Sequence, residues 1–426
     1  MSLLTAARRL SPVAVPPAVS RVSLLLRHLA TMPPLHTAPR RALLLLPPAP
    51  APSTYASLKA AYHAPLSAVL RELRRAQEPV LLELALACPH LYGHLDDPRG
   101  PLYSTTQQLV ADLYKLICIV AAKDAIDARV LLVAHPMHGK LQHAHVDSTP
   151  EQELQGPAID LPTLAKSSRN WTSVYSVESE EGERFLKSFL DMSRNTNVSK
   201  VRGGMVLNAS TSAGTVTDSF ANSPKHLAVA VGGTFDHLHI GHKLLLTMFA
   251  FVLSRRQQSD SPSVLTVGIT GDALLVNKKF ADQLESWKAR QESTHDFLHS
   301  ILYFGRPDDN RIQVQEVNEP GPNGHAVHIS YPFGLTIKYV EIWDPFGPTI
   351  TDKDITALAL SLETRGGGAA VNEKRKEQGW DPLEVYEVAV LDASEEDSVD
   401  ETFQSKLSST EIRRKRSELV KPRAKA

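Results

Sequence analysis

The stretch that decides the fold covers residues 227–242 and reads Leu-Ala-Val-Ala-Val-Gly-Gly-Thr-Phe-Asp-His-Leu-His-Ile-Gly-His. Its apolar part, Leu227–Val231, predicts a short buried strand, and the two glycines that follow allow a sharp turn that brings backbone N–H groups close to a ligand. A helix is expected from about Gly241 to Ser254, and its positive N-terminal end favours bound phosphate. With a second strand at Val264–Gly268, the pattern predicts a strand-helix-strand crossover of a parallel sheet.

Two histidines in this stretch are candidates for chemistry. His239 and His242 lie three residues apart around Gly241, so both imidazoles can face one ligand while the glycine leaves room for it. Either ring can donate hydrogen bonds to oxygens whose charge grows during transfer at phosphorus. A lone His-x-x-His is often a surface pair or a pair of metal ligands. Here the double glycine, the Thr-Phe-Asp prefix and the strand-turn-helix setting favour phosphate chemistry, and no metal held by protein side chains is expected.

Composition divides the chain of 426 residues into four regions. We expect an α/β protein in which a Rossmann-like parallel sheet follows a smaller α/β region and a disordered linker. Glycine, serine and acidic residues mark the linker, although a helix is expected within it at about Glu180–Met192. The expected regions are an unstructured tail or targeting segment at 1–40, an α/β region of unknown role at 41–145, a largely disordered linker at 146–222, and the nucleotide-handling domain at 223–426.

Bulk properties exclude several classes of protein. The formal net charge is −1, so nucleic acid is not an expected partner. The two cysteines, Cys88 and Cys118, have no metal-ligand spacing and fit a reducing compartment such as the cytoplasm. No apolar run approaches the roughly 20 residues that cross a bilayer. Residues 1–31 are rich in arginine and lack acidic residues, which is typical of a mitochondrial presequence; a disordered tail, or a start of translation at Met32, explains the same composition.

The histidine stretch resembles the Thr/His-x-Gly-His signature of the nucleotidyltransferase superfamily. A second motif near the C-terminus, Lys-Leu-Ser-Ser-Thr-Glu-Ile-Arg at residues 406–413, resembles the element that holds the ATP phosphates in that superfamily. Its hydroxyls can cap a helix and donate to phosphate, and Arg413 lies one turn further along.

Three further stretches resemble phosphopantetheine adenylyltransferases of the eukaryotic and archaeal type. They are Val-Gly-Ile-Thr at 267–270 with the lysines at 278 and 279, Asp-Pro-Phe-Gly-Pro at 344–348, and Ser-Leu-Glu-Thr at 361–364 followed by a glycine-rich segment ending at Arg375. Cytidylyltransferases lack the last of these. Read from the residues alone, 344–348 is a turn, and the triple glycine at 366–368 is a flexible loop or an anion nest. A Pro/Gly-rich insertion between Gly305 and Lys338 is expected to form a surface loop.

The resemblance implies a reaction and a set of site residues. AMP would pass from ATP, with its Mg²⁺, to 4′-phosphopantetheine. His239, His242, Thr234 and Lys278 are implied in catalysis, and Thr234, Lys278 and Asn372 in binding the acceptor. The residues implied in binding ATP are Gly233, Thr234, Phe235, His242, Ser408, Ser409, Thr410 and Arg413. Because the chain has no Gly-x-x-x-x-Gly-Lys-Ser/Thr loop, a fused dephospho-coenzyme A kinase is not expected, whereas association with other enzymes of coenzyme A synthesis is.

Two alternatives stay open. One is a cytidylyltransferase that acts on a phosphoalcohol, which differs in its nucleotide preference. The other is a non-catalytic scaffold that retains the fold, which would bind nucleotide without releasing pyrophosphate.

Overall fold

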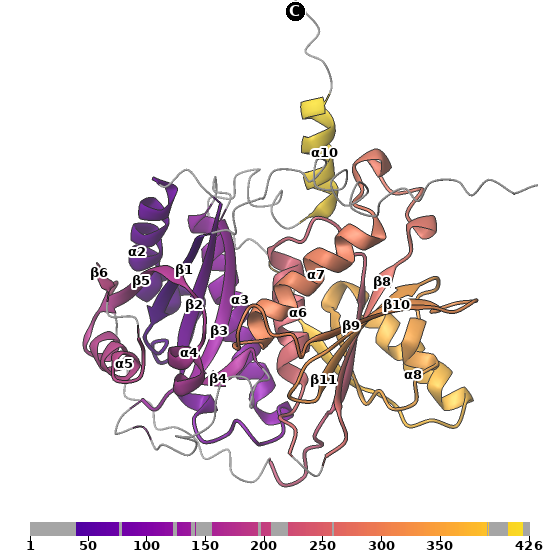
Figure 1. The fold of residues 1–426 in the computed structure, drawn as a ribbon, viewed down its shortest axis with the longest axis horizontal. Helices are drawn as coiled ribbons and strands as arrows, with labels where there is room; N and C mark the ends of the chain where they lie inside the picture. Colours follow the sequence, from indigo (N-terminus) through magenta and orange to yellow (C-terminus); the bar gives the residue numbers. More distant parts are fainter. Residues whose placement is uncertain are drawn as a thin grey trace, which may run out of the picture. The chain divides into compact units, whose positions relative to one another are not determined.

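The computed structural model describes residues 40–75, 79–121, 126–137, 141, 156–194, 197–205, 220–257, 260–389, 391 and 408–420. The tail or targeting segment expected at 1–40 therefore lies outside the described residues, apart from Arg40. Within the described part, the chain is an α/β protein with two sheets, and the predicted fold class is confirmed (Figure 1). None of the helices in this part is both long and apolar enough to cross a membrane.

The first sheet consists of parallel strands in the order β4-β3-β2-β1-β5-β6. β2 is buried at every position, as expected for a central parallel strand that is covered on both faces. The strands are β1 (Arg40–Leu46), β2 (Val80–Cys88), β3 (Ile126–Ala134), β4 (Ala158–Asp160), β5 (Trp171–Glu178) and β6 (Val198–Arg202).

Helices cover both faces of this sheet, because successive side chains of a strand point to opposite sides. Leu44 and Leu46 of β1 pack among residues of α2 and α3, whereas Leu43 and Leu45 pack among residues of α4 and α5. The connecting helices are α2 (Tyr55–Arg74), the short η2 (Pro89–Leu91), α3 (Gly100–Val120), α4 (Leu161–Lys166) and α5 (Glu180–Leu190).

The expectation of a largely disordered linker at 146–222 is wrong for residues 156–194 and 197–205. These residues supply β4, β5 and β6 of the first sheet, so this sheet does not end at residue 145. Polar residues concealed the edge strand β6, which buries only Val201. The helix expected at Glu180–Met192 is confirmed as α5, which docks through Phe185, Leu186 and Phe189. The other parts of 146–222 lie outside the described residues or, at 220–222, precede the second sheet.

The second sheet has the order β13-β12-β7-β8-β11-β10-β9, and its neighbouring strands are parallel except that β10 runs antiparallel to both β11 and β9. The predicted strand-helix-strand unit is confirmed as β7, α6 and β8. The strands are β7 (Ala228–Gly233), β8 (Ser263–Thr270), β9 (Gln313–Asn318), β10 (His325–Ser330), β11 (Leu335–Ile342), β12 (Ala357–Ser361) and β13 (Glu384–Val388). The helices are α6 (Ile240–Val252), η3 (Asp272–Leu274), η4 (Ala281–Gln283), α7 (Trp287–Leu302), η5 (Gly347–Ile350), η6 (Leu362–Thr364), α8 (Arg365–Glu377) and α10 (Ser409–Val420).

Two local expectations in this half are wrong. The surface loop expected between Gly305 and Lys338 contains the antiparallel pair β9–β10, and β10 also pairs with β11, which extends the sheet. The triple glycine is neither a loop nor an anion nest but lies in the first turns of α8. A Cβ atom on Gly368 would lie 2.9 Å from Leu360 Cδ2, so close helix–sheet packing explains one of the three glycines.

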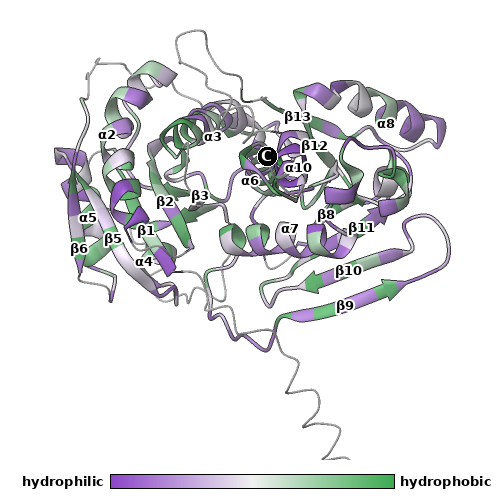
Figure 2. Cartoon of the chain, turned by 90° about the horizontal axis from the view of Figure 1, so that it is seen from above, coloured by the Kyte–Doolittle hydropathy of each residue, from purple (hydrophilic) through white to green (hydrophobic). Residues whose placement is uncertain are grey.

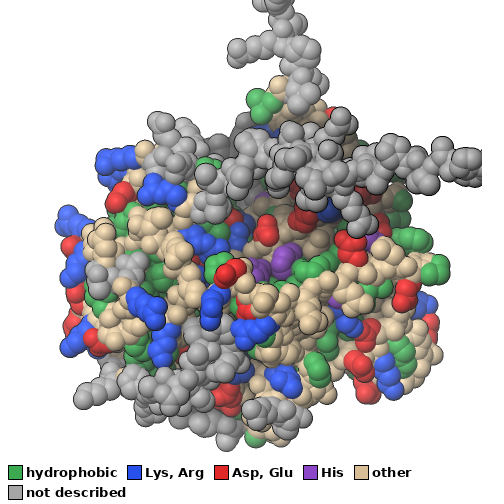
Figure 3. Space-filling model, in the orientation of Figure 1, with side chains coloured by type: hydrophobic (Ala, Val, Ile, Leu, Met, Phe, Trp, Pro, Cys, Tyr) green, Lys and Arg blue, Asp and Glu red, His purple; other side chains and the backbone are tan. Residues whose placement is uncertain are grey.

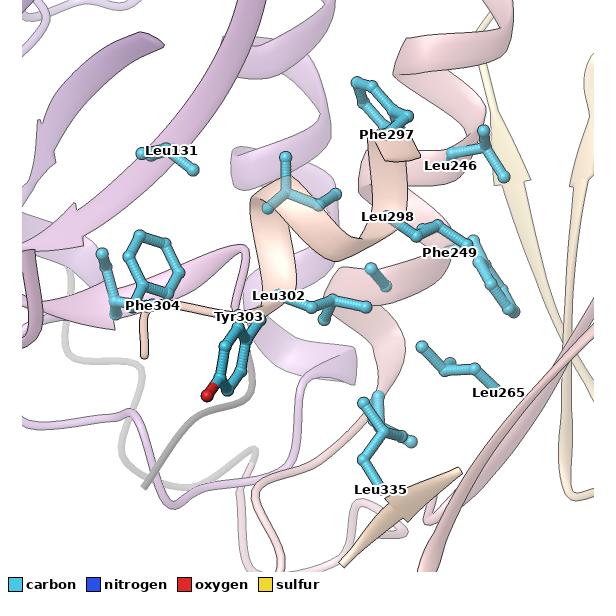
Figure 4. Packing of buried hydrophobic residues seen from close by; sticks show 14 of the residues in the cluster. Leu131, Leu246, Phe249, Leu265, Phe297, Leu298, Leu302, Tyr303, Phe304 and Leu335 are labelled. Carbon is cyan, nitrogen blue, oxygen red and sulfur yellow. The ribbon is translucent and has the colours of Figure 1, made fainter. Parts of the chain in front are cut away.

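The two halves share a hydrophobic core. α6 packs against α3, and α7 packs against both α6 and β3. Figure 4 shows Leu131 of β3 on the side of Phe304, which follows α7, and Phe249 of α6 on the side of the second sheet. Hydrophobic residues concentrate in the strands and in α6, whereas α8 is largely hydrophilic (Figure 2). Of the helices that border the second sheet, α6 and α7 therefore lie between the two halves.

Candidate active site

The site is built at the carboxyl end of β7. This strand lies between β12 and β8, so the chain leaves it at the point where the strand order reverses, which is where ligands bind in open α/β sheets. Gly233 closes the strand against Phe235, and a Cβ atom there would lie 3.0 Å from the Phe235 ring. Phe235 (φ 52°) and His237 (φ 47°) both adopt the left-handed conformation, which is costly for residues with side chains and often marks functional loops.

His239 and His242 meet as predicted. His239 is the residue that precedes the first turn of α6, and its ring stacks on that of His242 with 3.8 Å between centroids and 20° between planes. The ring of Phe235 lies 5.5 Å from that of His242. Histidine side chains reach the surface in the middle of the face shown in Figure 3, with basic and acidic side chains beside them.

Both imidazoles are neutral near pH 7. Burial, together with the charges of Lys243 and His237, lowers the pKa of His239 to about 4. Burial and the neighbouring His239 hold the pKa of His242 well below its usual value. The Nδ1 atoms of both rings are buried without a hydrogen-bond partner in the described part of the chain. Two neutral imidazoles with hydrogen-bonding capacity to spare suit a ligand whose oxygens are negative.

The C-terminal motif reaches this loop through Arg413. Its guanidinium forms an ion pair with the buried carboxylate of Asp236, and it also donates to Lys279 O at 3.0 Å and to Thr410 Oγ1 at 3.2 Å. Ser409 Oγ donates to Asp236 O at 2.8 Å. The two motifs expected to share one site are therefore in contact. Arg413 is expected from its motif to bind ATP. It is instead only 3% exposed and donates to protein oxygens, so it anchors α10.

The hydroxyl-bearing residues of this motif lie at the start of α10. Ser408 precedes the helix and its carbonyl accepts from Ile412 N, while Ser409 and Thr410 form its first turn. All three are partly exposed. Their placement next to the loop keeps them as candidates for phosphate binding at a helix N-terminus.

Asp236, His237 and Glu285 form a second polar group beside the loop. Glu285 Oε1 lies 3.0 Å from His237 Nδ1, and Asp236 Oδ1 accepts from Glu285 N at 3.0 Å. Burial opposes protonation of His237, but its hydrogen bond to the Glu285 carboxylate and the nearby negative charges raise its pKa overall. These three residues could hold a metal ion by their spacing. Because Arg413 pairs with Asp236 and His237 pairs with Glu285, the carboxylates are already neutralised, and we assign no metal ion to this group.

Arg290 is a site residue that the sequence reasoning missed. It is fully buried and donates to Thr234 O at 2.6 Å, Thr270 O at 2.7 Å and Asp272 Oδ1 at 2.7 Å, which ties together the ends of β7 and β8. The sequence pattern does contain one indication that Arg290 is buried. It falls on the apolar face of α7 with Trp287, Thr294 and Phe297.

The remaining expected residues are placed less closely. Lys278 is exposed in the segment after η3, next to Lys279, whose carbonyl holds Arg413. Asn372 lies on α8, where its amide donates to Leu383 O at 3.0 Å and accepts from Leu383 N at 2.8 Å, so its polar atoms already serve the fold. The turn expected at 344–348 is confirmed, since Asp344 Oδ1 accepts from Phe346 N and Gly347 N at 2.7 Å.

Comparison with known proteins places this chain in a family. Residues 32–207 match a family described as a domain of unknown function (DUF8446). An uncharacterised protein of Schizosaccharomyces pombe is 34% identical over 46% of this chain and 50% of its own length, and a phosphopantetheine adenylyltransferase of Saccharomyces cerevisiae is 36% identical over 45% and 48%. The chain thus spans about half the length of these two relatives. A phosphopantetheine adenylyltransferase of Thermococcus gammatolerans is 30% identical over 38% of this chain and 77% of its own length. The chain belongs to the phosphopantetheine adenylyltransferase family.

Proposed function

We propose that this protein transfers AMP from ATP to 4′-phosphopantetheine, giving dephospho-coenzyme A and pyrophosphate, as the adenylyltransferases of the eukaryotic and archaeal type do. The observation that carries the proposal is the stacked pair His239–His242. It is neutral, has free hydrogen-bonding capacity, and lies at the switch point of a parallel sheet in contact with the second motif. A cytoplasmic location fits this activity, with mitochondrial targeting by residues 1–31 as a further possibility to test.

In the proposed reaction, a phosphate oxygen of the acceptor attacks the α-phosphorus of ATP. The bond from that phosphorus to the oxygen bridging to the β-phosphorus breaks, and its electron pair leaves with pyrophosphate. No covalent enzyme intermediate forms. Such a transfer depends on positioning and charge stabilisation more than on covalent chemistry by the protein.

Each site residue has a proposed part in this transfer. Thr234, whose carbonyl is held by Arg290, orients the attacking phosphate. His239 and His242 donate to the oxygens of the α-phosphoryl group, and Lys278 neutralises charge on the phosphates. Mg²⁺ bound to the triphosphate supplies further charge neutralisation. Gly233 and Phe235 shape the nucleotide side of the loop, and Ser408, Ser409 and Thr410 at the start of α10 hold the β- and γ-phosphates.

Asn372 has weaker support as an acceptor-binding residue, since both ends of its amide are bonded to Leu383. Any contact with the acceptor would have to share or replace one of these bonds. Association with other enzymes of coenzyme A synthesis is part of the proposal but has no described contact behind it.

The test is pyrophosphate release by the full chain with Mg²⁺ and 4′-phosphopantetheine, with either ATP or CTP. Release with ATP alone supports the proposal, and release with CTP supports a cytidylyltransferase. If ATP binds but no pyrophosphate appears with either nucleotide, the adenylyltransferase proposal fails and a non-catalytic role is favoured.

A further inference from the structure

The first sheet contacts the helix that carries the two histidines. Lys243 directly follows His242 and lies one turn after His239, whose carbonyl accepts from Lys243 N at 2.9 Å. The Lys243 side chain is only 11% exposed, and its Nζ lies 2.5 Å from Oδ1 of Asp127 on β3. One turn further along α6, Thr247 Oγ1 lies 3.3 Å from the hydroxyl of Tyr114 on α3. The first two turns of α6 are therefore held from the N-terminal half.

Asp127 is itself fixed in place. Its second oxygen accepts from Arg129 Nη2 at 2.7 Å, and the other arm of that guanidinium donates to Asp296 O of α7 at 2.8 Å. Burial opposes ionisation of Asp127, but the charges of Lys243 and Arg129 outweigh it and hold its pKa well below the usual value. Asp127 thus pairs directly with Lys243 of α6 and is linked to α7 through Arg129.

The second of these helices is also docked on the N-terminal half. Arg169 donates to Ser300 O and Tyr303 O at the C-terminal end of α7, and it is paired with the fully buried Glu83. Near its other end, α7 carries Arg290, which holds Thr234 O. A cation at the C-terminal end of a helix complements the dipole as well as the free carbonyls.

We propose that Asp127 is a positioning residue of the active site: by holding Lys243 it fixes the first turn of α6, and with it His239 and His242, so that the N-terminal half is a required part of the transferase. This inference rests on the proposed function. It gives a role to the region that matches a domain of unknown function, since β3 lies within residues 32–207.

The central test compares Asp127→Asn, Lys243→Met and the double variant with the parent chain. We expect Asp127→Asn to lower kcat between about tenfold and a hundredfold, because a misplacement on the order of 1 Å has that scale of effect, with a smaller change in KM for ATP. Both single variants break the same Asp127–Lys243 pair. The decrease in kcat of the double variant is therefore expected to be much smaller than the product of the two single decreases. The matched control is Glu183→Gln, which removes an exposed ion pair with Lys200 of 2.6 Å in the same half and should leave kcat unchanged.

An NMR titration of His239 provides a readout that a merely structural role would not move. The groups that act on this ring are Lys243 and His242 of α6 and His237 of the loop, with Asp127 and Arg129 behind Lys243. Lys243→Met should raise the pKa of His239 because it removes a nearby positive charge. Asp127→Asn should lower it because it leaves that charge less neutralised.

The outcomes separate this inference from the proposed function. If the parent chain releases no pyrophosphate, the proposed function fails, while the opposite shifts of His239 still support the coupling. If Asp127→Asn lowers the melting temperature but leaves kcat and the His239 titration as in the parent, the positioning role is overturned. Should Asp127→Asn not fold, Lys243→Met decides in the same way: unchanged kcat and an unchanged His239 pKa overturn the proposal.

Discussion

Arg413 of the last described helix and Asp236 of the β7–α6 loop form a buried ion pair across 177 positions of sequence. The Asp236 side chain is fully buried and that of Arg413 is 4% exposed. The pair links the two motifs that resemble signatures of the nucleotidyltransferase superfamily. The aspartate of the Thr-Phe-Asp prefix therefore serves as an anchor for α10.

Removing the cation of this pair should be strongly destabilising. In Arg413→Met, Asp236 keeps a buried charge without its partner, so the free energy of unfolding should fall by about 3–5 kcal/mol, as for other broken buried pairs. Denaturant unfolding measures this. Arg414→Met is the control, because the next residue pairs with Glu411 and Glu418 at the surface, where such pairs contribute at most about 1 kcal/mol. Equal losses in the two variants would contradict the anchoring role.

Replacing either stacked histidine should slow the chemical step. We expect His242→Ala to raise the barrier by about 2.7–4 kcal/mol, a loss of roughly 10²–10³ in kcat, which is the scale for one charge-stabilising donor. Pyrophosphate release under saturating ATP and acceptor measures it. His63→Ala, an exposed histidine of α2, should behave like the parent chain. Near-full turnover in His242→Ala would remove this residue from the mechanism.

Local patterns predicted the centre of the site, and long-range contacts supplied what was missed. The run from β7 into α6 could be recognised because a buried strand, two glycines and a helix start lie within sixteen residues. The Asp236–Arg413 pair and the contacts of Arg290 depend on groups brought together by the fold, so no spacing in the sequence indicates them. β4 and β6 were missed for another reason, since three- and five-residue edge strands carry too little hydrophobic periodicity to detect.

Buried histidines should make the protein less stable as the pH falls. Burial lowers the pKa of His239 and His295 to about 4 and, with help from His295 and nearby arginines, that of His299 to about 3. Between the unfolded value of about 6.5 and these folded values, the unfolded chain binds protons that the folded chain does not, so stability rises with pH in this window. The free energy of unfolding should therefore decrease from pH 7 to pH 4. His295→Gln, which keeps a polar group near the Tyr339 hydroxyl at 3.1 Å, should make this decrease shallower. An identical pH slope in the variant would contradict the assignment.

Arg290 should matter for catalysis although it is buried behind the loop. Its planar fork donates to Thr234 O, Thr270 O and Asp272 Oδ1, and a lysine offers one ammonium in place of that fixed geometry. We expect Arg290→Lys to free the Thr234 carbonyl and reduce kcat/KM for the acceptor by about tenfold or more, the effect of a small misplacement of a positioning group. Lys288→Gln is the control, because this neighbour on α7 is 77% exposed and makes only a surface pair with Glu292. If Arg290→Lys is less stable but keeps the parent kcat/KM, Thr234 does not depend on this arginine for its position. The proposed role of α7 in placing the attacking phosphate is then wrong.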